Sequence, residues 1–233
     1  MNTQKICKET KMDQSLEAQF RGRFADPDFS VLELAAINWL DGFYQLEHLL
    51  STRAWTMRLV PTASAELKFA ALVHDAERFF PGGPSGTPDT SFDDPDYLFA
   101  HSIRSADIVE DWLRKQPSVP EAFIRRVRQL VLRHEIGGNT EEDILQAADS
   151  LSWFDTLDWL AYEWASSGKL SHGKVCDKLD WMLTRIRPTV AMENALGIYR
   201  EAIASLEGRN DVAQMNLAER RRIAGSKTVL LGL

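Results

Sequence analysis

The sequence predicts an all-α fold, built as a single compact helical bundle, and three observations support this prediction. Apolar residues recur at helical spacing along most of the chain, and no stretch has the alternating pattern of a β-strand. Residues that begin or break helices separate these stretches. The chain has 233 residues, 44% of them hydrophobic, which is enough for a sizeable buried core.

The N-terminal part of the chain predicts two helical stretches. A weak pattern over residues 14–24 ends at the sequence ADPD, where the proline breaks it. A longer stretch over residues 30–60 should bend near Asp41 and Gly42. The predicted organisation has three parts, which are an N-terminal extension (1–29), a helical core (30–168) and C-terminal helices with a tail that pack on the core (169–233).

The next helix is expected to open at Pro61 and Thr62 and to continue through AELKFAALVHDAERFF, because proline is favoured in a first helical turn. Its apolar spacing predicts a buried face made of Phe69, Leu72, Val73 and Ala76. Residues 81–96 are dense in Gly, Pro, Ser and Asp. They predict a long irregular loop, and such loops often carry function.

Five further helices complete the prediction. A helix over residues 96–116 precedes one whose inward face combines apolar residues with a histidine, namely Phe123, Val127, Leu130, Val131 and His134. Two glycines end that helix, and Thr140 with the acidic residues after it predicts the start of a helix over residues 140–168. The last two are expected over residues 171–187 and 188–207.

Composition excludes several classes of protein. The formal net charge of −7 would repel polyanions, so extended nucleic-acid contact is not expected. The two cysteines are too few for a disulfide framework and fit a reducing cytoplasm. No apolar run has the length of a signal peptide or a membrane span, so we expect a cytoplasmic protein without membrane contact.

Histidines and aspartates follow an ordered pattern through the predicted core. A His-Asp pair alone is a weak signal in a chain with five histidines. Here three further histidines and an aspartate lie on separate predicted helices, and most of these residues fall on or near inward-facing positions. The full set is His48, His74, Asp75, His101, His134 and Asp149.

This order, H…HD…H…H…D, resembles the metal-binding signature of the HD-domain superfamily of metal-dependent phosphohydrolases. The phrases FAALVHDAERF and DILQAADSLSWFD are similar to the segments that carry the HD pair and the last aspartate in that family. The resemblance covers about residues 45–164 and implies a helical bundle of the HD type. It also implies a first metal site formed by four residues, which are His48, His74, Asp75 and Asp149. Asp75 would bridge to a second ion held by His101 and His134.

The chemistry of these ligands agrees with a metal site. Imidazole nitrogens and carboxylate oxygens together suit Mn, Fe, Co, Ni or Zn, so one or two divalent transition-metal ions are expected. Such ions lower the pKa of bound water and supply a hydroxide near neutral pH. The expected activity is hydrolysis of a small phosphorylated substrate, as a phosphomonoesterase or phosphodiesterase, with a nucleotide among the candidates.

Residues next to these ligands are candidates for supporting roles. Arg78 occupies the place where many members of the resembled family have a lysine, and it could hold a phosphate oxygen during catalysis. Arg104 and Arg133 are further candidates for substrate binding, although each arginine could equally form a surface ion pair. Glu77 could donate a proton or orient a ligand. The predicted catalytic group consists of Asp75, Glu77 and Arg78.

Other conspicuous residues are interpreted as structural. His172 stands at a predicted helix start and should be solvated. Trp153, Trp159 and Trp164 are expected to pack in the core or at an interface rather than to stack on bases. Residues 220–222, three consecutive arginines, are expected to lie on a solvated tail.

Two alternatives to hydrolysis stay open from the sequence. The same superfamily includes di-iron oxygenases that use the same ligand pattern to cleave C–C or C–P bonds, although the sequence shows no motif specific to them. A non-catalytic regulator that binds a nucleotide is the second alternative, and the complete ligand set disfavours it. The pattern leaves the substrate open, and a homo-oligomer is compatible with it.

Overall fold

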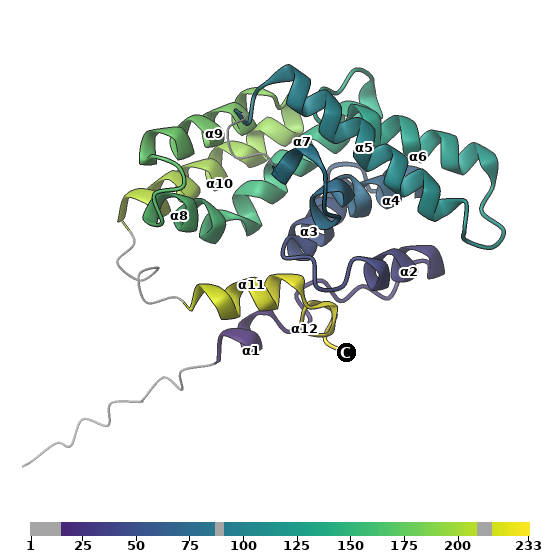
Figure 1. Ribbon diagram of the computed structural model, residues 1–233, viewed down its shortest axis with the longest axis horizontal. Helices are drawn as coiled ribbons and strands as arrows, with labels where there is room; N and C mark the ends of the chain where they lie inside the picture. The colour runs from purple at the N-terminus through teal and green to yellow at the C-terminus, as the bar shows by residue number, and fades with distance from the viewer. Residues whose placement is uncertain (1–14, 87–90, 209–215) are drawn as a thin grey trace, which may run out of the picture.

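The computed structural model describes residues 15–86, 91–208 and 216–233, and these residues form α- and 3-10 helices with no strand among them. The predicted all-α class is therefore confirmed. Figure 1 shows one group of helices around α3 to α6, a second group of α8 to α10, and α1 beside α11 and α12 on another face. None of the described helices has the length and apolar content needed to cross a bilayer.

Two long helices connect the parts of the structure. These are α3 (Leu46–Leu59) and α7 (Thr140–Thr156), which pack along each other. Each contributes side chains to both hydrophobic cores, as Leu49 and Trp55 of α3 illustrate. A residue on the facing sides of α3 and α7 therefore lies deep in the protein.

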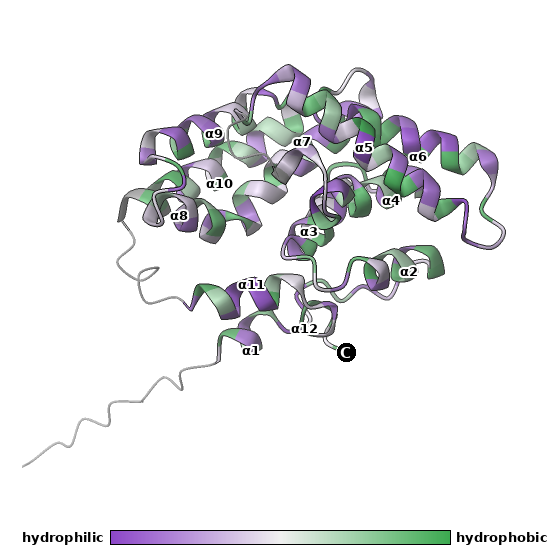
Figure 2. Ribbon diagram, in the orientation of Figure 1, coloured by the Kyte–Doolittle hydropathy of each residue, from purple (hydrophilic) through white to green (hydrophobic). Residues whose placement is uncertain are grey.

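The first core is formed mainly by helices before residue 140, to which Leu145 of α7 and the C-terminal residues Leu230 and Leu231 are added. α4 (Ala65–Val73) packs on α3, and α5 (Pro95–Leu113) lies side by side with α6 (Glu121–Arg133). Figure 2 shows that α5 and α6 carry both apolar and polar residues, as expected for helices that cover a core. The predicted buried face of the HD-containing segment is confirmed, since Phe69, Leu72, Val73 and Ala76 are all buried.

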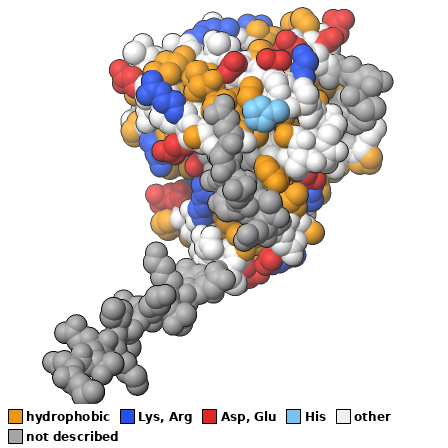
Figure 3. Space-filling view, turned by 90° about the vertical axis from the view of Figure 1, so that its left-hand side faces the viewer, with side chains coloured by type: hydrophobic (Ala, Val, Ile, Leu, Met, Phe, Trp, Pro, Cys, Tyr) orange, Lys and Arg blue, Asp and Glu red, His pale blue; other side chains and the backbone are white. Residues whose placement is uncertain are grey.

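The second core lies under the C-terminal helices. It is enclosed by α8 (Asp158–Ser166), α9 (His172–Thr184) and α10 (Thr189–Gly208), which pack on α7. Trp153 and Trp159 are buried in it, so the prediction that tryptophans pack in the core is confirmed for them. Figure 3 shows a face of the molecule on which basic, acidic and apolar side chains are interspersed.

The two ends of the described chain pack together. Near the N-terminus lie α1 (Leu16–Phe20) and α2 (Val31–Trp39), and at the C-terminus lie α11 (Leu217–Gly225) and α12 (Lys227–Leu231). The amide of Gly22 donates to the carbonyl of Val229 at 2.8 Å. A Cβ on Gly225 would lie 3.1 Å from the backbone of Gly42, so this close crossing favours glycine. The N-terminal extension predicted over residues 1–29 lies partly outside the described residues.

The interpretation of residues 220–222 as a solvated tail was wrong. Arg220 is buried, and its guanidinium contacts the carboxylate of Glu47 at 2.5 Å. Arg221 pairs with Glu163 at 2.8 Å. Only Arg222 of the three is mostly exposed at its side chain, and it still pairs with Glu17. A charge run in the sequence did not reveal that the C-terminal helices return to α3.

Three predicted helix boundaries were also wrong. The stretch over residues 30–60 is broken rather than bent, because α2 ends at Trp39 and α3 begins at Leu46. Ser64 begins α4 in place of Pro61 and Thr62, since its hydroxyl accepts the backbone N–H of Leu67. The stretch over residues 140–168 forms two helices separated at Leu157, and Asn139 caps the first of them instead of Thr140.

The loop predicted over residues 81–96 is irregular where it is described. It contains a single 3-10 turn, η2 (Pro84–Gly86), and leads into α5 at Pro95. Residues 87–90 lie outside the described part of the chain.

Candidate metal centre

The structure brings together all six residues predicted to be metal ligands. Each of them is buried. His48 lies in the first turn of α3, and Asp149 lies in the middle of α7, which faces it. His74 and His134 are the residues that end α4 and α6, and His101 comes from α5. Asp75 follows His74 directly and precedes the 3-10 turn η1 (Ala76–Phe79).

The end of α4 at His74 allows both members of the His-Asp pair to face the cluster. Neighbouring side chains on a continuous α-helix diverge by about 100°. Because α4 ends at Val73 and a 3-10 turn starts after Asp75, both members of the pair are directed into the same cluster.

One group of ligand atoms surrounds Asp149. Its Oδ1 lies 3.1 Å from Nε2 of His48 and 3.5 Å from Nε2 of His74. The rings of these two histidines are 5.3 Å apart at their centroids. His48 and His74 can also meet Asp75, because one ligand atom from each of the three lies within 4.8 Å of the others.

A second group surrounds Asp75. Its Oδ1 lies 2.8 Å from Nε2 of His101 and 3.8 Å from Nε2 of His134. Ligand atoms of Asp75, His101 and His134 likewise lie within 4.8 Å of one another. Asp75 therefore belongs to both groups, which is the position expected of a ligand that bridges two ions.

Hydrogen bonds fix which ring nitrogen faces the cluster in His74 and His134. Nδ1 of His74 lies 3.1 Å from the carbonyl of Ala71, and Nδ1 of His134 lies 2.7 Å from the carbonyl of Val131. A carbonyl only accepts, so each Nδ1 carries the proton. These carbonyls lie in the last turn of a helix, where an acceptor lacks the regular N–H partner four residues further on.

The other two rings are oriented in the same way. The hydroxyl of Ser152 donates to the carbonyl of His48 at 2.7 Å, so it accepts from Nδ1 of the same residue at 2.9 Å. Nδ1 of His101 donates to the carboxylate of Glu77 at 2.7 Å. Glu77 is thereby placed as a group that orients a ligand, one of the two roles expected for it, and Ser85 holds it in turn.

When such a ring is neutral, its Nδ1 carries the proton and its Nε2 lone pair faces the carboxylates. The Nε2 atoms of His74 and His134 are buried without a hydrogen-bond partner among the described residues. Burial lowers the pKa of His134, which favours this neutral form. Lone pairs and carboxylate oxygens that face one another need a proton or a cation between them, and this donor set fits a divalent transition metal.

Charges in the cluster shift the pKa values of its members. Burial would raise the pKa of Asp75, but the Arg78 guanidinium and the neighbouring histidines hold it well below its usual range. Burial likewise opposes ionisation of Asp149, and Arg185 holds the pKa of that carboxyl well below its usual range. For His74, burial favours the neutral ring, but the two carboxylates outweigh burial and raise its pKa. Both aspartates are thus ionised at neutral pH and can act as ligands.

Two charged residues at this site were missed from the sequence. Glu135 follows His134 directly, and its Oε1 lies 3.7 Å from Nε2 of that histidine. Arg185 is the residue that ends α9, and it forms ion pairs with Asp149 and Glu135. The position of Glu135 next to His134 in the sequence could have identified it as a residue of the site. Arg185 could be found only by knowing that α9 packs against α7.

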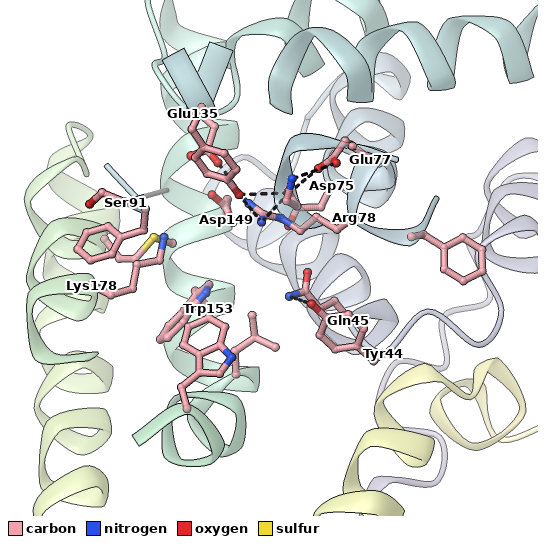
Figure 4. A pocket seen from close by; sticks show the side chains of 18 of the residues that line it. Tyr44, Gln45, Asp75, Glu77, Arg78, Ser91, Glu135, Asp149, Trp153 and Lys178 are labelled. Atoms are coloured by element: carbon pink, nitrogen blue, oxygen red, sulfur yellow. Dashed lines mark hydrogen bonds and ion pairs between the residues drawn. The ribbon is translucent and has the colours of Figure 1, made fainter. Parts of the chain in front are cut away.

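A cavity of about 800 Å³ opens beside the cluster. Asp75 and Asp149 line it at one end, and Figure 4 shows Trp153 across the cavity from them, with Lys178 and Tyr44 on opposite flanks. A ligand in the cavity would therefore contact the candidate metal ligands at one end and aromatic side chains elsewhere.

The three arginines predicted to bind substrate are placed differently. Arg78 lines the cavity, lies 2.9 Å from Oδ2 of Asp75 through its Nε, and donates to the hydroxyl of Tyr97 at 2.8 Å. Arg104 instead donates to the carbonyl of Pro81 at 2.7 Å. The Nε atom of Arg133 lies 3.5 Å from the carboxylate of Glu142. Neither Arg104 nor Arg133 is among the residues that line this cavity.

Comparison with known proteins identifies no relative. No protein-family model, no curated protein and no solved structure matches the chain. The candidate metal centre therefore rests on the residues and contacts of this chain alone.

Proposed function

We propose that this chain is a metal-dependent hydrolase of small phosphate esters, with a metal centre of the HD-domain type. One observation carries the proposal. Four buried imidazoles have their Nδ1 protons bound to fixed acceptors, so their Nε2 atoms converge on two ionised aspartates beside a cavity. Second partners that fix the ring orientation are typical of histidines that bind metals.

The residues divide into ligands and supports. His48, His74, Asp75 and Asp149 would hold one cation, and His101 with His134 would extend the site to a second through Asp75. A bound divalent cation would supply a hydroxide near neutral pH and offset the negative charge that develops on a phosphate.

Arg78 supports a phosphate as the substrate group. Its guanidinium lines the cavity next to Asp75, so a phosphate oxygen near the cation would lie within its reach. Asp75 and the hydroxyl of Tyr97 fix the orientation of this guanidinium before a substrate arrives. Tyr44, Trp153 and the other aromatic side chains of the cavity offer contact area to the organic part of the substrate.

Phosphate release tests this function directly. The full-length chain would be incubated with nucleoside monophosphates and sugar phosphates in the presence of Mn²⁺, and free phosphate would be measured. We expect metal-dependent release that falls at least about 1,000-fold in Asp75→Ala, because the cation contributes several kcal/mol to such reactions. Asp107→Ala removes an exposed carboxylate that pairs with Arg128 and serves as the control.

Two outcomes would contradict the proposal. Full release in the presence of a chelator, or in His74→Ala, would exclude the cluster from the reaction. Tightly bound iron with oxygen consumption and no phosphate release would instead identify the oxygenase chemistry.

A further inference from the structure

Lys178 is a cavity residue whose charge the structure does not neutralise. It lies on α9, and its Nζ lies 4.2 Å from the ring centroid of Trp181, 5.3 Å from that of Phe92 and 5.9 Å from that of Trp153. Within residues 15–86, 91–208 and 216–233, it makes no hydrogen bond or ion pair. The rings attract the ammonium through their faces but carry no negative charge, so an anion bound beside Lys178 would stabilise it further.

The other cations of the cavity are already compensated. Arg78 pairs with Asp75, and Arg185 pairs with Asp149 and Glu135. At the rim, Lys174 lies 3.7 Å from Asp177 and Lys169 is exposed to solvent. Lys178 is therefore the cation inside the cavity that has no anionic partner among the described residues.

The position of Lys178 suits a ligand with two kinds of surface. Figure 4 shows Lys178 on one flank of the cavity, between the cluster that contains Asp149 and the side chain of Trp153. The rings beside it provide apolar contact, while its ammonium provides three donors. We propose that Lys178 is an anion-binding residue of this cavity in addition to Arg78, and that it contacts a phosphate or carboxylate group of an organic ligand whose apolar part packs on the neighbouring rings.

The electrostatics agree with this assignment. Burial and the nearby Arg185 lower the pKa of Lys178 to about 7, and the carboxylates of Glu135 and Asp149 oppose that shift. A bound anion would favour the charged form of the amine and strengthen the contact. A role of Lys178 in substrate binding rests on the proposed function. Binding of an anion at Lys178 can be measured separately, without hydrolysis.

Calorimetric binding to the full-length chain, treated with a chelator, tests the proposal. The probes are phenyl phosphate, phenylacetate and the neutral benzyl alcohol. For Lys178→Met we expect binding of at least one of the two anions to weaken about tenfold or more, because a charge-assisted hydrogen bond is lost. The anion with the larger loss identifies phosphate or carboxylate as the preferred group. Lys115→Met makes the same change of charge at an exposed position and should bind as the wild type does.

Two further variants keep the test valid if Lys178→Met does not fold. Lys178→Arg retains the charge and should retain binding within a few-fold, whereas Lys178→Gln should lose it. The proposal is overturned if Lys178→Gln binds both anions as tightly as the wild type, if neither anion binds the wild type, or if benzyl alcohol binding falls as much as anion binding. Anion binding that depends on Lys178 in a chain that releases no phosphate would refute the proposed hydrolysis and leave this site standing.

Discussion

Each histidine of the cluster is oriented by a neighbour that accepts its Nδ1 proton. Two of these acceptors are carbonyls in the last turns of α4 and α6, and two are the side chains of Glu77 and Ser152. The six candidate ligands could be predicted from the sequence, because their order and their inward positions are visible there. Glu77 was also visible beside Asp75. Ser152 was less visible, although it lies one turn after Asp149 and so shares a face of α7.

The positions of two α9 residues beside the cluster could not be predicted from the sequence. Lys178 and Arg185 are two turns apart, so they share one face of the helix predicted over residues 171–187. The sequence gives no sign that this face covers the cluster rather than solvent. Only the packing of α9 on α7 brings Arg185 to Asp149.

Metal affinity should decrease as the pH falls. A histidine ligand must be neutral to bind a cation, and the pKa of His74 is raised above the ordinary value of about 6.5 by Asp75 and Asp149. Protons therefore compete with the metal below neutral pH, and affinity is greatest above the raised pKa. Titration of the metal-free chain with Zn²⁺ at pH 6, 7 and 8 measures this, with about a tenfold loss per pH unit expected at the acidic end. An affinity independent of pH would mean that imidazoles are not the ligands.

Helix ends place two of the candidate ligands. His74 and His134 are both the residues at which a helix stops, and Asn139 begins α7 through a capping box with Glu142. The existence of these helices followed from apolar periodicity. Their exact ends did not, because Ser64 and Asn139 compete with equally plausible capping residues a few positions away.

The packing of the C-terminal helix α11 on α3 was not predicted from the sequence. Glu47 precedes His48 on α3 and is fully buried between Arg23 and Arg220. The Arg220 side chain is only 4% exposed, so α11 is held to α3 by a buried ion pair directly beside a candidate metal ligand.

Arg220→Met should destabilise the fold by about 3 kcal/mol, because it leaves a buried carboxylate with only the partly exposed Arg23 as partner. Chemical denaturation measures the change in the free energy of unfolding. Arg222→Met is the matched control on the same helix, since that side chain is 54% exposed, and it should change stability little. Equal effects of the two substitutions would show that Glu47 does not depend on Arg220.

At the scale of the whole molecule, the candidate metal centre lies where the two hydrophobic cores meet. Leu49 and Trp55 of α3 belong to different cores, as do Leu145 and Leu151 of α7, and His48 and Asp149 lie on these same helices. The all-α class could be predicted because helical periodicity is a local property of the sequence. The packing of the C-terminal helices on α3 and the position of α9 beside the cavity could not be predicted. Both depend on contacts between residues far apart in the chain.

The metal content of the purified chain tests the central claim most directly. After saturation with Mn²⁺ or Zn²⁺ and removal of free metal, we expect one or two ions per chain in the wild type and in His172→Ala, which alters an exposed histidine. His74→Ala and Asp149→Ala should lose the first ion, while His101→Ala should lose only the second. Wild-type metal content in both His74→Ala and Asp149→Ala would contradict the assignment of this cluster as a metal centre.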